Sequence, residues 1–196
     1  LDRLLKLILR RAADLMGAPA GALSLWDEER QVLGSRIRFG EMFGTMPQRP
    51  LALGDGMMGR VAASRQGLLV NDYRTWPGAR PDTLAHTRVT AALAEPLLYR
   101  ERLIGVINLA HGDGGTFTPE HATLLRLFAD QAAIAIENAR LYTAADGQRR
   151  QLEAVQAVTA EITRELEVTR VLHLILARAM GLLDTKSGAV FQWDAA

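Results

Sequence analysis

Residues 90–111, TAALAEPLLYRERLIGVINLAH, contain the strongest β-hairpin pattern of the chain. Two apolar runs of strand length, Thr90 to Tyr99 and Leu103 to His111, flank the polar segment Arg100-Glu101-Arg102. Apolar runs separated by a short polar turn are typical of paired strands. We therefore expect an antiparallel hairpin here, and the neighbouring segments are interpreted outward from it.

The segments before this hairpin alternate between helical, strand and irregular patterns. Asp2 precedes apolar residues at helical spacing, and Gly17 and Pro19 end that pattern, which predicts a first helix. The glycines of residues 54–59 indicate a tight turn with positive φ rather than a phosphate-binding loop, because no Lys-Ser/Thr ending follows them. Strands are expected at 21–27, 31–38 and 68–71, a short helix at 60–66, and irregular loops at 39–50 and 73–87.

A long helical pattern follows the hairpin. Thr118 is at an N-cap position, Pro119 is at the first helical position, and His121 is where a capping box would have Glu. The pattern runs to about Tyr142, and Asp146-Gly147 then weakens it. Heptad spacing resumes at Leu152, Val155, Thr159, Ile162 and Leu166. This short stripe predicts packing against a partner helix, with packing on its own domain as the alternative.

Residues 3–27 reappear near the end of the chain. They align without a gap with residues 170–194, and 12 of the 25 paired positions are identical. A repeat of domain length indicates tandem domains rather than a solenoid. The sequence therefore predicts a first domain at 1–145, a helical connector at 146–167 and a truncated start of a second domain at 168–196. We expect the truncated part, with a helix at 170–183 and a strand at 188–193, to dock on a neighbouring chain.

Composition excludes several classes of protein. The chain has 196 residues, 48% of them hydrophobic, and a net charge of +1, as in ordinary globular proteins. It has no cysteine, which excludes disulfides, thiolate metal sites, cysteine nucleophiles and thioether-linked cofactors. The basic residues are dispersed, which argues against a nucleic-acid-binding face. No apolar run is long enough to span a membrane.

A set of short motifs occurs in one order over residues 2–145. They are Leu53-Gly54-Asp55-Gly56, Gly59-Arg60-Val61-Ala62, Val70-Asn71-Asp72, Pro96-Leu97, Gly105-Val106-Ile107-Asn108-Leu109, Phe117-Thr118-Pro119-Glu120 and the run FADQAAIAIENARL at 128–141. In this order the sequence resembles a GAF domain, and residues 168–196 resemble the start of a second one.

The resemblance implies an α+β fold with a six-stranded antiparallel sheet. Its terminal helices would cover one face, and irregular segments that usually enclose a small-molecule pocket would cover the other. It also implies a cytoplasmic sensory or dimerising module of a bacterial signalling protein, with a sensor histidine kinase as the first expectation. In that setting the helices at 119–166 would pair in a parallel homodimer and transmit the signal.

Three specialisations that occur among GAF domains do not match this sequence. Bilin attachment and free methionine sulfoxide reduction both need cysteine, which the chain lacks. Cyclic-nucleotide-binding members carry Asn-Lys followed by a Phe and an Asp-Glu pair, whereas here Leu109 follows Asn108, and His121-Ala122 follow Phe117 at the Asp-Glu position. No nucleophile with a base, paired acids or metal cluster is recognisable, so we expect no enzymatic activity.

The candidate ligand-binding residues come from the two loops that should cover the pocket. They are Phe39, Met42, Phe43, Asp72, Tyr73, Arg74, Trp76 and His86. Pockets need an apolar lining with a few placed polar groups, which these residues offer. Two alternatives remain open: the aromatic side chains fill the interior and leave a ligand-free dimerisation scaffold, or His86 binds haem non-covalently in a gas or redox sensor. The identity of any cofactor is unknown from the sequence.

Overall fold

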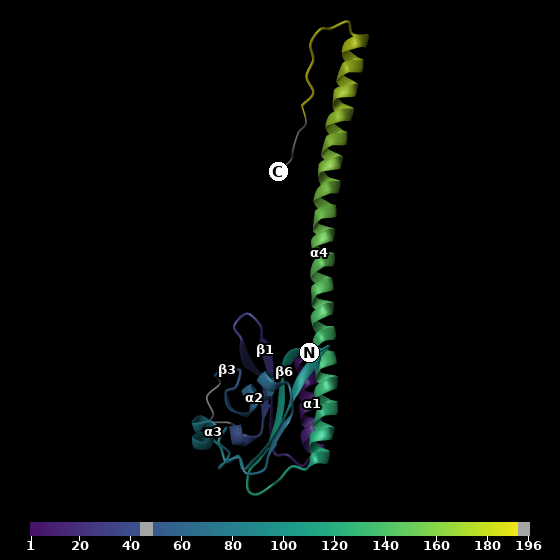
Figure 1. The fold of residues 1–196 in the computed structure, drawn as a ribbon. Helices are drawn as coiled ribbons and strands as arrows, with labels where there is room; N and C mark the ends of the chain where they lie inside the picture. The colour runs from purple at the N-terminus through teal and green to yellow at the C-terminus, as the bar shows by residue number, and fades with distance from the viewer. Residues whose placement is uncertain (44–48, 192–196) are drawn as a thin grey trace. The chain divides into compact units, whose positions relative to one another are not determined.

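The hairpin forms and lies inside a six-stranded antiparallel sheet in the order β3-β2-β1-β6-β5-β4 (Figure 1). The computed structural model describes residues 1–43 and 49–191, with the side chains of all but 161, 162 and 164–167. The strands are β1 (Ala20–Asp27), β2 (Val32–Phe39), β3 (Leu51–Ala52), β4 (Leu68–Val70), β5 (Ala91–Tyr99) and β6 (Arg102–His111). The expected fold class is confirmed.

Two helices cover one face of the sheet, α1 (Asp2–Leu15) and the first part of α4 (Pro119–Leu182) (Figure 1). Their apolar stripes and alternate residues of the strands form one buried core, because helical and strand periodicities each place apolar side chains on a single face. The core includes Leu5, Leu9 and Ala12 of α1, Leu125, Ala129 and Ala132 of α4, and Leu23, Leu93, Ile107 and Leu109 of the sheet.

The beginning of α4 has the capping arrangement that the sequence indicates. The Thr118 hydroxyl accepts a hydrogen bond from the backbone N–H of His121 at 3.3 Å, and His121 Nδ1 accepts one from the Thr118 N–H at 3.3 Å. Histidine thus takes the place of the Glu of a capping box and satisfies the exposed N–H groups of the first turn.

The opposite face of the sheet is covered by short elements, η1 (Glu41–Phe43), α2 (Gly56–Ser64) and α3 (Pro81–His86). The sequence analysis expected an irregular loop where α3 forms, which is wrong for residues 81–86. Pro81 is at the first position of α3, where its fixed φ suits a helix and its missing N–H costs nothing. Strand β3 was also missed, because two residues are too few to show a pattern.

Helix α4 continues through Asp146-Gly147 without a break. Asp146 accepts ion pairs from Arg149 at 3.0 Å and from Arg150 at 2.8 Å, and such pairs offset part of the helix propensity that Gly147 lacks. The chain divides into two compact units, Leu1–Leu141 and Tyr142–Ala196. The division into domains at 145 and 167 stays a prediction.

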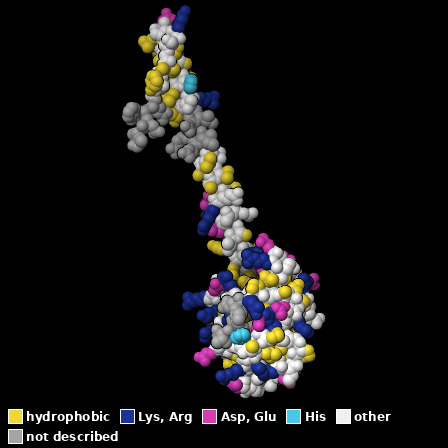
Figure 2. Space-filling view, turned by 90° about the vertical axis from the view of Figure 1, so that its left-hand side faces the viewer, with side chains coloured by type: hydrophobic (Ala, Val, Ile, Leu, Met, Phe, Trp, Pro, Cys, Tyr) yellow, Lys and Arg dark blue, Asp and Glu magenta, His cyan; other side chains and the backbone are white. Residues whose placement is uncertain are grey.

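Residues 188–191 form no strand, and residues 192–193 of the expected strand lie outside the described part of the chain. A single strand has no ladder of hydrogen bonds to hold it. Over the described residues, no helix is long and apolar enough to cross a membrane. Figure 2 shows acidic and basic side chains interspersed on the visible face of the first unit.

Candidate functional site

A cavity of about 100 Å³ lies between the sheet and the short elements on its second face. Its apolar wall consists largely of small side chains of the strands, with methionines of α2 opposite them. A water molecule needs only about a tenth of this volume on the same measure, so the cavity has room for a small organic molecule. Its apolar lining includes Ala22, Leu33, Phe43, Leu51, Met57, Met58, Val89, Ala92 and Ala110.

A β-bulge in β2 decides which side chains of that strand reach the cavity. Leu23 of β1 pairs with Ile37 and Ser24 pairs with Ser35, so Arg36 is an extra residue in β2. An extra residue reverses the alternation of faces beyond it.

The reversal is visible on both sides of the bulge. Ser35 lines the cavity before it and Arg38 lines the cavity after it, although strict alternation would put them on opposite faces. Arg36 pairs instead with Asp2 of α1 at 2.7 Å. Phe39 packs into the helix-side core, where the Arg10 guanidinium lies 5.6 Å from its ring centre.

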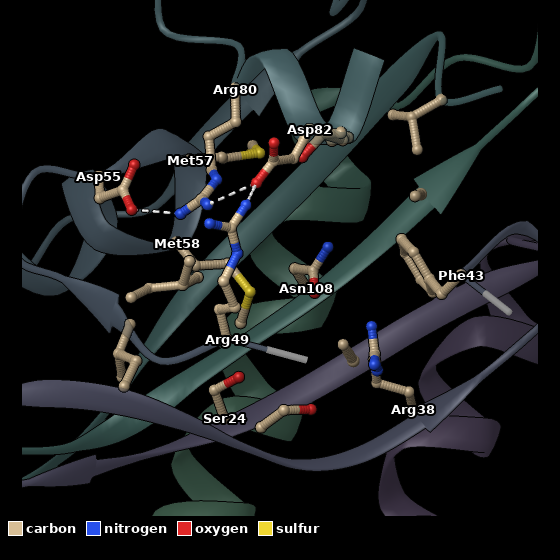
Figure 3. A pocket seen from close by; sticks show the side chains of 18 of the residues that line it. Ser24, Arg38, Phe43, Arg49, Asp55, Met57, Met58, Arg80, Asp82 and Asn108 are labelled. Atoms are coloured by element: carbon tan, nitrogen blue, oxygen red, sulfur yellow. Dashed lines mark hydrogen bonds and ion pairs between the residues drawn. The ribbon is translucent and has the colours of Figure 1, made fainter. Parts of the chain in front are cut away.

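Charged side chains from three covering segments meet at one end of the cavity (Figure 3). Arg80 forms ion pairs with Asp55 and, at 3.3 Å, with Asp82, and Arg49 forms another with Asp82. The Arg80 side chain is only 16% exposed, so its charge needs these partners. The cluster ties the loop before β3, the beginning of α2 and the beginning of α3 together.

Gly56 makes room for this cluster. A Cβ at this position would lie 2.7 Å from Cδ of Arg80, and the residue has φ +61°, which favours glycine. Gly54 also has a positive φ, of +82°. The positive φ expected of this glycine segment is confirmed for Gly54 and Gly56. The short helix was expected at 60–66, whereas α2 begins at Gly56 and ends at Ser64, so residues 57–59 belong to the helix and not to the turn.

Polar side chains also face the cavity from the strands. Asn108 of β6 is 9% exposed, and its Oδ1 is buried with no hydrogen-bond partner in the described part of the chain. In the view of Figure 3, Asn108 lies between Arg38 and the Arg49–Arg80 pair. Burial lowers the pKa of the Arg38 guanidinium. Burial also raises the pKa of the Tyr73 hydroxyl, against the opposite influence of its hydrogen bond to Thr83.

The structure brings only some of the sequence-predicted site residues together. Tyr73 and Phe43 line the cavity. Met42 and His86 line a separate, open hollow with Arg88. His86 Nδ1 lies 2.9 Å from the Asp82 carbonyl oxygen and so has a structural contact of its own.

The remaining candidates do not line the cavity. Asp72 is exposed, and Arg74 donates hydrogen bonds to the carbonyl oxygens of Leu84 and Thr87, both at 3.3 Å. The Trp76 ring packs against Tyr73 with centres 5.7 Å apart. Phe39 lies on the helix side because of the bulge. Whether any of the predicted residues contacts a ligand stays a prediction.

The sequence analysis missed most charged and polar residues of the lining. Asn108 carried a usable signal, because it is a polar residue inside the apolar run 103–110. Arg38, Arg49 and Arg80 carried none, since arginines in or beside loops are normally solvent-exposed. Among the residues that the structure describes, no three His, Asp or Glu side chains are grouped so that they could hold a metal ion.

Comparison with known proteins agrees with this architecture. Residues 1–137 match the GAF domain family. Three solved structures are similar to the chain. The GAF domain of a phosphoenolpyruvate-protein phosphotransferase from Coxiella burnetii is 21% identical, with a TM-score of 0.64, over 73% of this chain and 86% of that one.

The second GAF domain of DevS from Mycobacterium smegmatis is 21% identical, with a TM-score of 0.56, over 77% of this chain and 99% of that one. Free methionine-R-sulfoxide reductase from Neisseria meningitidis, in complex with its substrate, is 18% identical, with a TM-score of 0.60, over 70% of this chain and 80% of that one. These likenesses show the fold, and the family match covers more than half of the chain. The chain belongs to the GAF domain family, whose members are sensory and regulatory domains.

Proposed function

We propose that this domain is the sensory module of a cytoplasmic signal-transduction protein, with a sensor histidine kinase as the first output class to test. It binds a small molecule in the cavity and has no catalytic activity of its own. The observation that supports this most directly is the cavity itself. Its wall is apolar, it carries charged groups at one end, and it lies on the sheet face opposite α1 and α4.

Strand β6 offers a route from the cavity to the helices. Asn108 lines the cavity, whereas its neighbours Ile107 and Leu109 are fully buried in the core with α1 and α4. A small displacement of β6 by a ligand therefore acts directly on the helix packing. The ligand shifts the helices only if it binds one arrangement more tightly than the other.

The output surface in this proposal is an apolar stripe along α4. Leu127, Ile134 and Leu141 are exposed and lie seven residues apart. Leu152 and Val155 continue the same heptad frame and are also exposed, and the side chains of Ile162 and Leu166 lie outside the described part. In Figure 2, hydrophobic side chains recur along the helical part of the second unit. A heptad stripe of this kind suits pairing with α4 of a second copy.

Ligand binding is tested by a thermal-shift screen of small metabolites on the wild-type chain and on Ala22→Leu. Ala22 lines the cavity, so a leucine there fills space that a ligand needs. A ligand that raises the Tm of the wild type but not of Ala22→Leu supports the proposal. Hits that stabilise both proteins equally bind elsewhere and count against it.

Transmission of the ligand signal to α4 is tested by disulfide crosslinking. The chain has no native cysteine, so every crosslink comes from the introduced residue. Val155→Cys places a thiol in the apolar stripe, and Ala157→Cys places a matched one on the opposite side of α4. We expect a faster dimer crosslink at Val155→Cys, with a rate that changes when the ligand binds. Equal crosslinking rates at both positions, or rates that no ligand changes, would refute the proposal that ligand binding alters the pairing of α4.

The two alternatives have less support on the described residues. A ligand-free scaffold would have a filled interior, whereas a cavity is present. A haem site would need His86 beside the cavity, whereas it is exposed and hydrogen-bonded to the backbone of α3. The second alternative is tested by incubating the protein with haem and removing the unbound haem. The absence of a Soret band from the protein would then reject haem binding.

A further inference from the structure

We propose that the ion pair between Arg102 of β6 and Glu137 of α4 is the contact through which occupation of the cavity displaces α4. This inference rests on the proposed function, because it names the residues that connect the same cavity to the output helix. Both are positioning residues, since neither lines the cavity. Three features support it: the place of Glu137 on α4, the face of β6 on which Arg102 lies, and the reach of β6 into the cavity.

Glu137 is the last buried residue of α4 within the part of the chain that the structure describes. It is 7% exposed, and its neighbour Ile136 belongs to the helix-side core. From residue 138 on, every described residue of the helix is exposed or partly exposed. The apolar stripe continues with Leu141, about one turn further along. The sheet therefore last holds α4 at Glu137, just before the surface that is proposed to pair.

The carboxylate of Glu137 has two cationic partners, of which one belongs to the sheet. Arg102, the first residue of β6, forms an ion pair with its Oε2. Arg140 lies 4.0 Å from the same oxygen but is part of α4, so it moves with the helix. The Glu137 side chain is only 9% exposed, and a carboxylate buried to this extent is unfavourable without a cation beside it. The attraction to Arg102 therefore ties this turn of α4 to the beginning of β6.

A β-bulge interrupts β6 close to Arg102. Between the consecutive residues Leu97–Leu98 of β5, the paired residue on β6 changes from Gly105 to Leu103. Ile104 is thus an extra residue in β6, and an extra residue reverses the alternation of faces beyond it.

This bulge decides the face on which Arg102 lies. Ile104 packs against the helix-side core, whereas Val106 and Asn108 lie on the cavity side. Strict alternation from Asn108 would place Arg102 on the cavity side as well. Because of the extra residue, Arg102 lies on the face that α4 covers, where it donates a hydrogen bond to Glu137. Bulges commonly redirect a functional side chain in this way.

The same strand lines the cavity further along. Asn108 and Ala110 are on its cavity side, and β6 is paired with β1 and β5 on its two edges. The apolar contacts of Ile107 and Leu109 with the helices have no preferred direction, so they tolerate sliding. A hydrogen-bonded ion pair depends on distance and angle, and it is lost when its partners separate. Among these contacts, the ion pair is therefore the one that makes α4 follow a displacement of β6.

The test fills the cavity by mutation and needs no known ligand. Ala110→Leu adds a larger side chain to the cavity wall on β6 itself, and Ala22→Leu fills the same cavity from β1 should the first variant fail to fold. The readout is hydrogen–deuterium exchange of the backbone amides of residues 138–141, measured on the full chain. We expect Ala110→Leu to change these exchange rates at least about threefold when the ion pair is present.

Variants of the ion pair separate coupling from a merely structural role. In Arg102→Gln, the same leucine should change the exchange rates by about 1.5-fold or less, whereas a structural role would alter the starting rates and leave the response in place. Arg102→Lys keeps the charge and should restore the response. Arg36→Gln is the matched control, because a bulge also turns Arg36 to the helix side but its partner is Asp2 of α1. Its response should equal that of the wild type.

A response in Arg102→Gln as large as in the wild type would overturn the inference and leave the proposed function standing. An equal loss of the response in Arg36→Gln and Arg102→Gln would overturn it too, as would the absence of any response to either leucine in the wild type. The proposed function is decided separately, on whether Ala22→Leu removes the Tm increase caused by hits from the metabolite screen.

Discussion

The two faces of the sheet are built from alternating residues of the same strands, yet they are covered in different ways. Leu93 and Leu109 on the helix side are fully buried against α1 and α4. Their neighbours Ala92 and Ala110 on the other side face a cavity. A long amphipathic helix offers an unbroken apolar stripe that packs along a sheet, whereas the short segments of the other face bury a second core cluster, with Leu33, Val61 and Val106, and leave a cavity beside it. Both faces therefore have a buried core, and this cavity lies on the face that the short elements cover.

The largest expected effect is the loss of a large side chain from the packed face. Leu9→Ala removes a fully buried side chain of α1 and leaves a hole between the helices and the sheet. We expect it to lower the free energy of unfolding by about 2–5 kcal/mol, measured by urea denaturation. Leu7→Ala is the control on the same helix, because Leu7 is 54% exposed, and it should cost less than about 1 kcal/mol. Similar losses for both would mean that the helix face is not closely packed.

Replacing a buried alanine with leucine should show the difference in packing between the two faces of the sheet most clearly. Ala132→Leu in α4 inserts a larger side chain into the packed core and should cost about 1–3 kcal/mol. Ala22→Leu makes the same change beside the cavity, where space is available, and should be close to neutral. The comparison fails if the cavity-side variant loses as much stability as the helix-side one in the same urea titration.

One acidic residue on the packed face gives a pH-dependent test. Glu95 is 5% exposed, its Oε2 is buried without a hydrogen-bond partner in the described part, and burial raises its pKa above the ordinary 4.5. A raised pKa means that the native state holds the proton more tightly than the unfolded state does. The stability that Glu95 contributes is therefore present below pH 4.5 and is lost as the pH rises through the native pKa.

Glu95→Gln should thus raise the Tm at neutral pH, by an amount that corresponds to about 1 kcal/mol. The gain should shrink toward zero as the pH falls below 4.5, because the wild-type carboxyl group is then neutral too. Glu101→Gln, at an exposed position in the turn of the same hairpin, is the control and should show no such trend. A gain that is independent of pH would exclude charge burial as the cause.

The smallest expected effect concerns the ion pair between Arg36 and Asp2. Both side chains are about half exposed, so water screens their attraction. Arg36→Gln should change the free energy of unfolding by less than about 1 kcal/mol, and added salt should reduce the difference further. A larger loss, measured by urea denaturation at low salt, would show that the bulge itself depends on this pair.

Elements with a regular pattern over many residues, or with a known capping sequence, could be predicted from the sequence. Very short elements, and features that depend on ion pairs, could not. The first helix, the central hairpin and the cap of α4 follow from spacing and from Thr118, Pro119 and His121. Helix α3 is shorter than two turns, which is too short for a periodic pattern. Continuity of α4 through Gly147 depends on ion pairs that propensity alone does not describe.

The candidate site shows the same division. Tyr73 and Phe43 were found because aromatic side chains in covering loops commonly line pockets. His86 and Met42 come from the same loops but lie at another hollow, since the direction of a loop side chain depends on the whole path of the loop. Spacing along the sequence carries little information about that path.

The sequence by itself determined the α+β class, the first helix, the central hairpin, the family and the absence of any cysteine chemistry. Only the tertiary structure decided which face each residue of β2 occupies. Strict alternation from Leu33 would have placed Phe39 in the cavity. Because Arg36 is an extra residue in β2, Arg38 lines the cavity instead and Phe39 packs on the helix side. A bulge depends on how β2 pairs with β1, a contact between residues far apart along the chain, and periodicity within one strand does not record it.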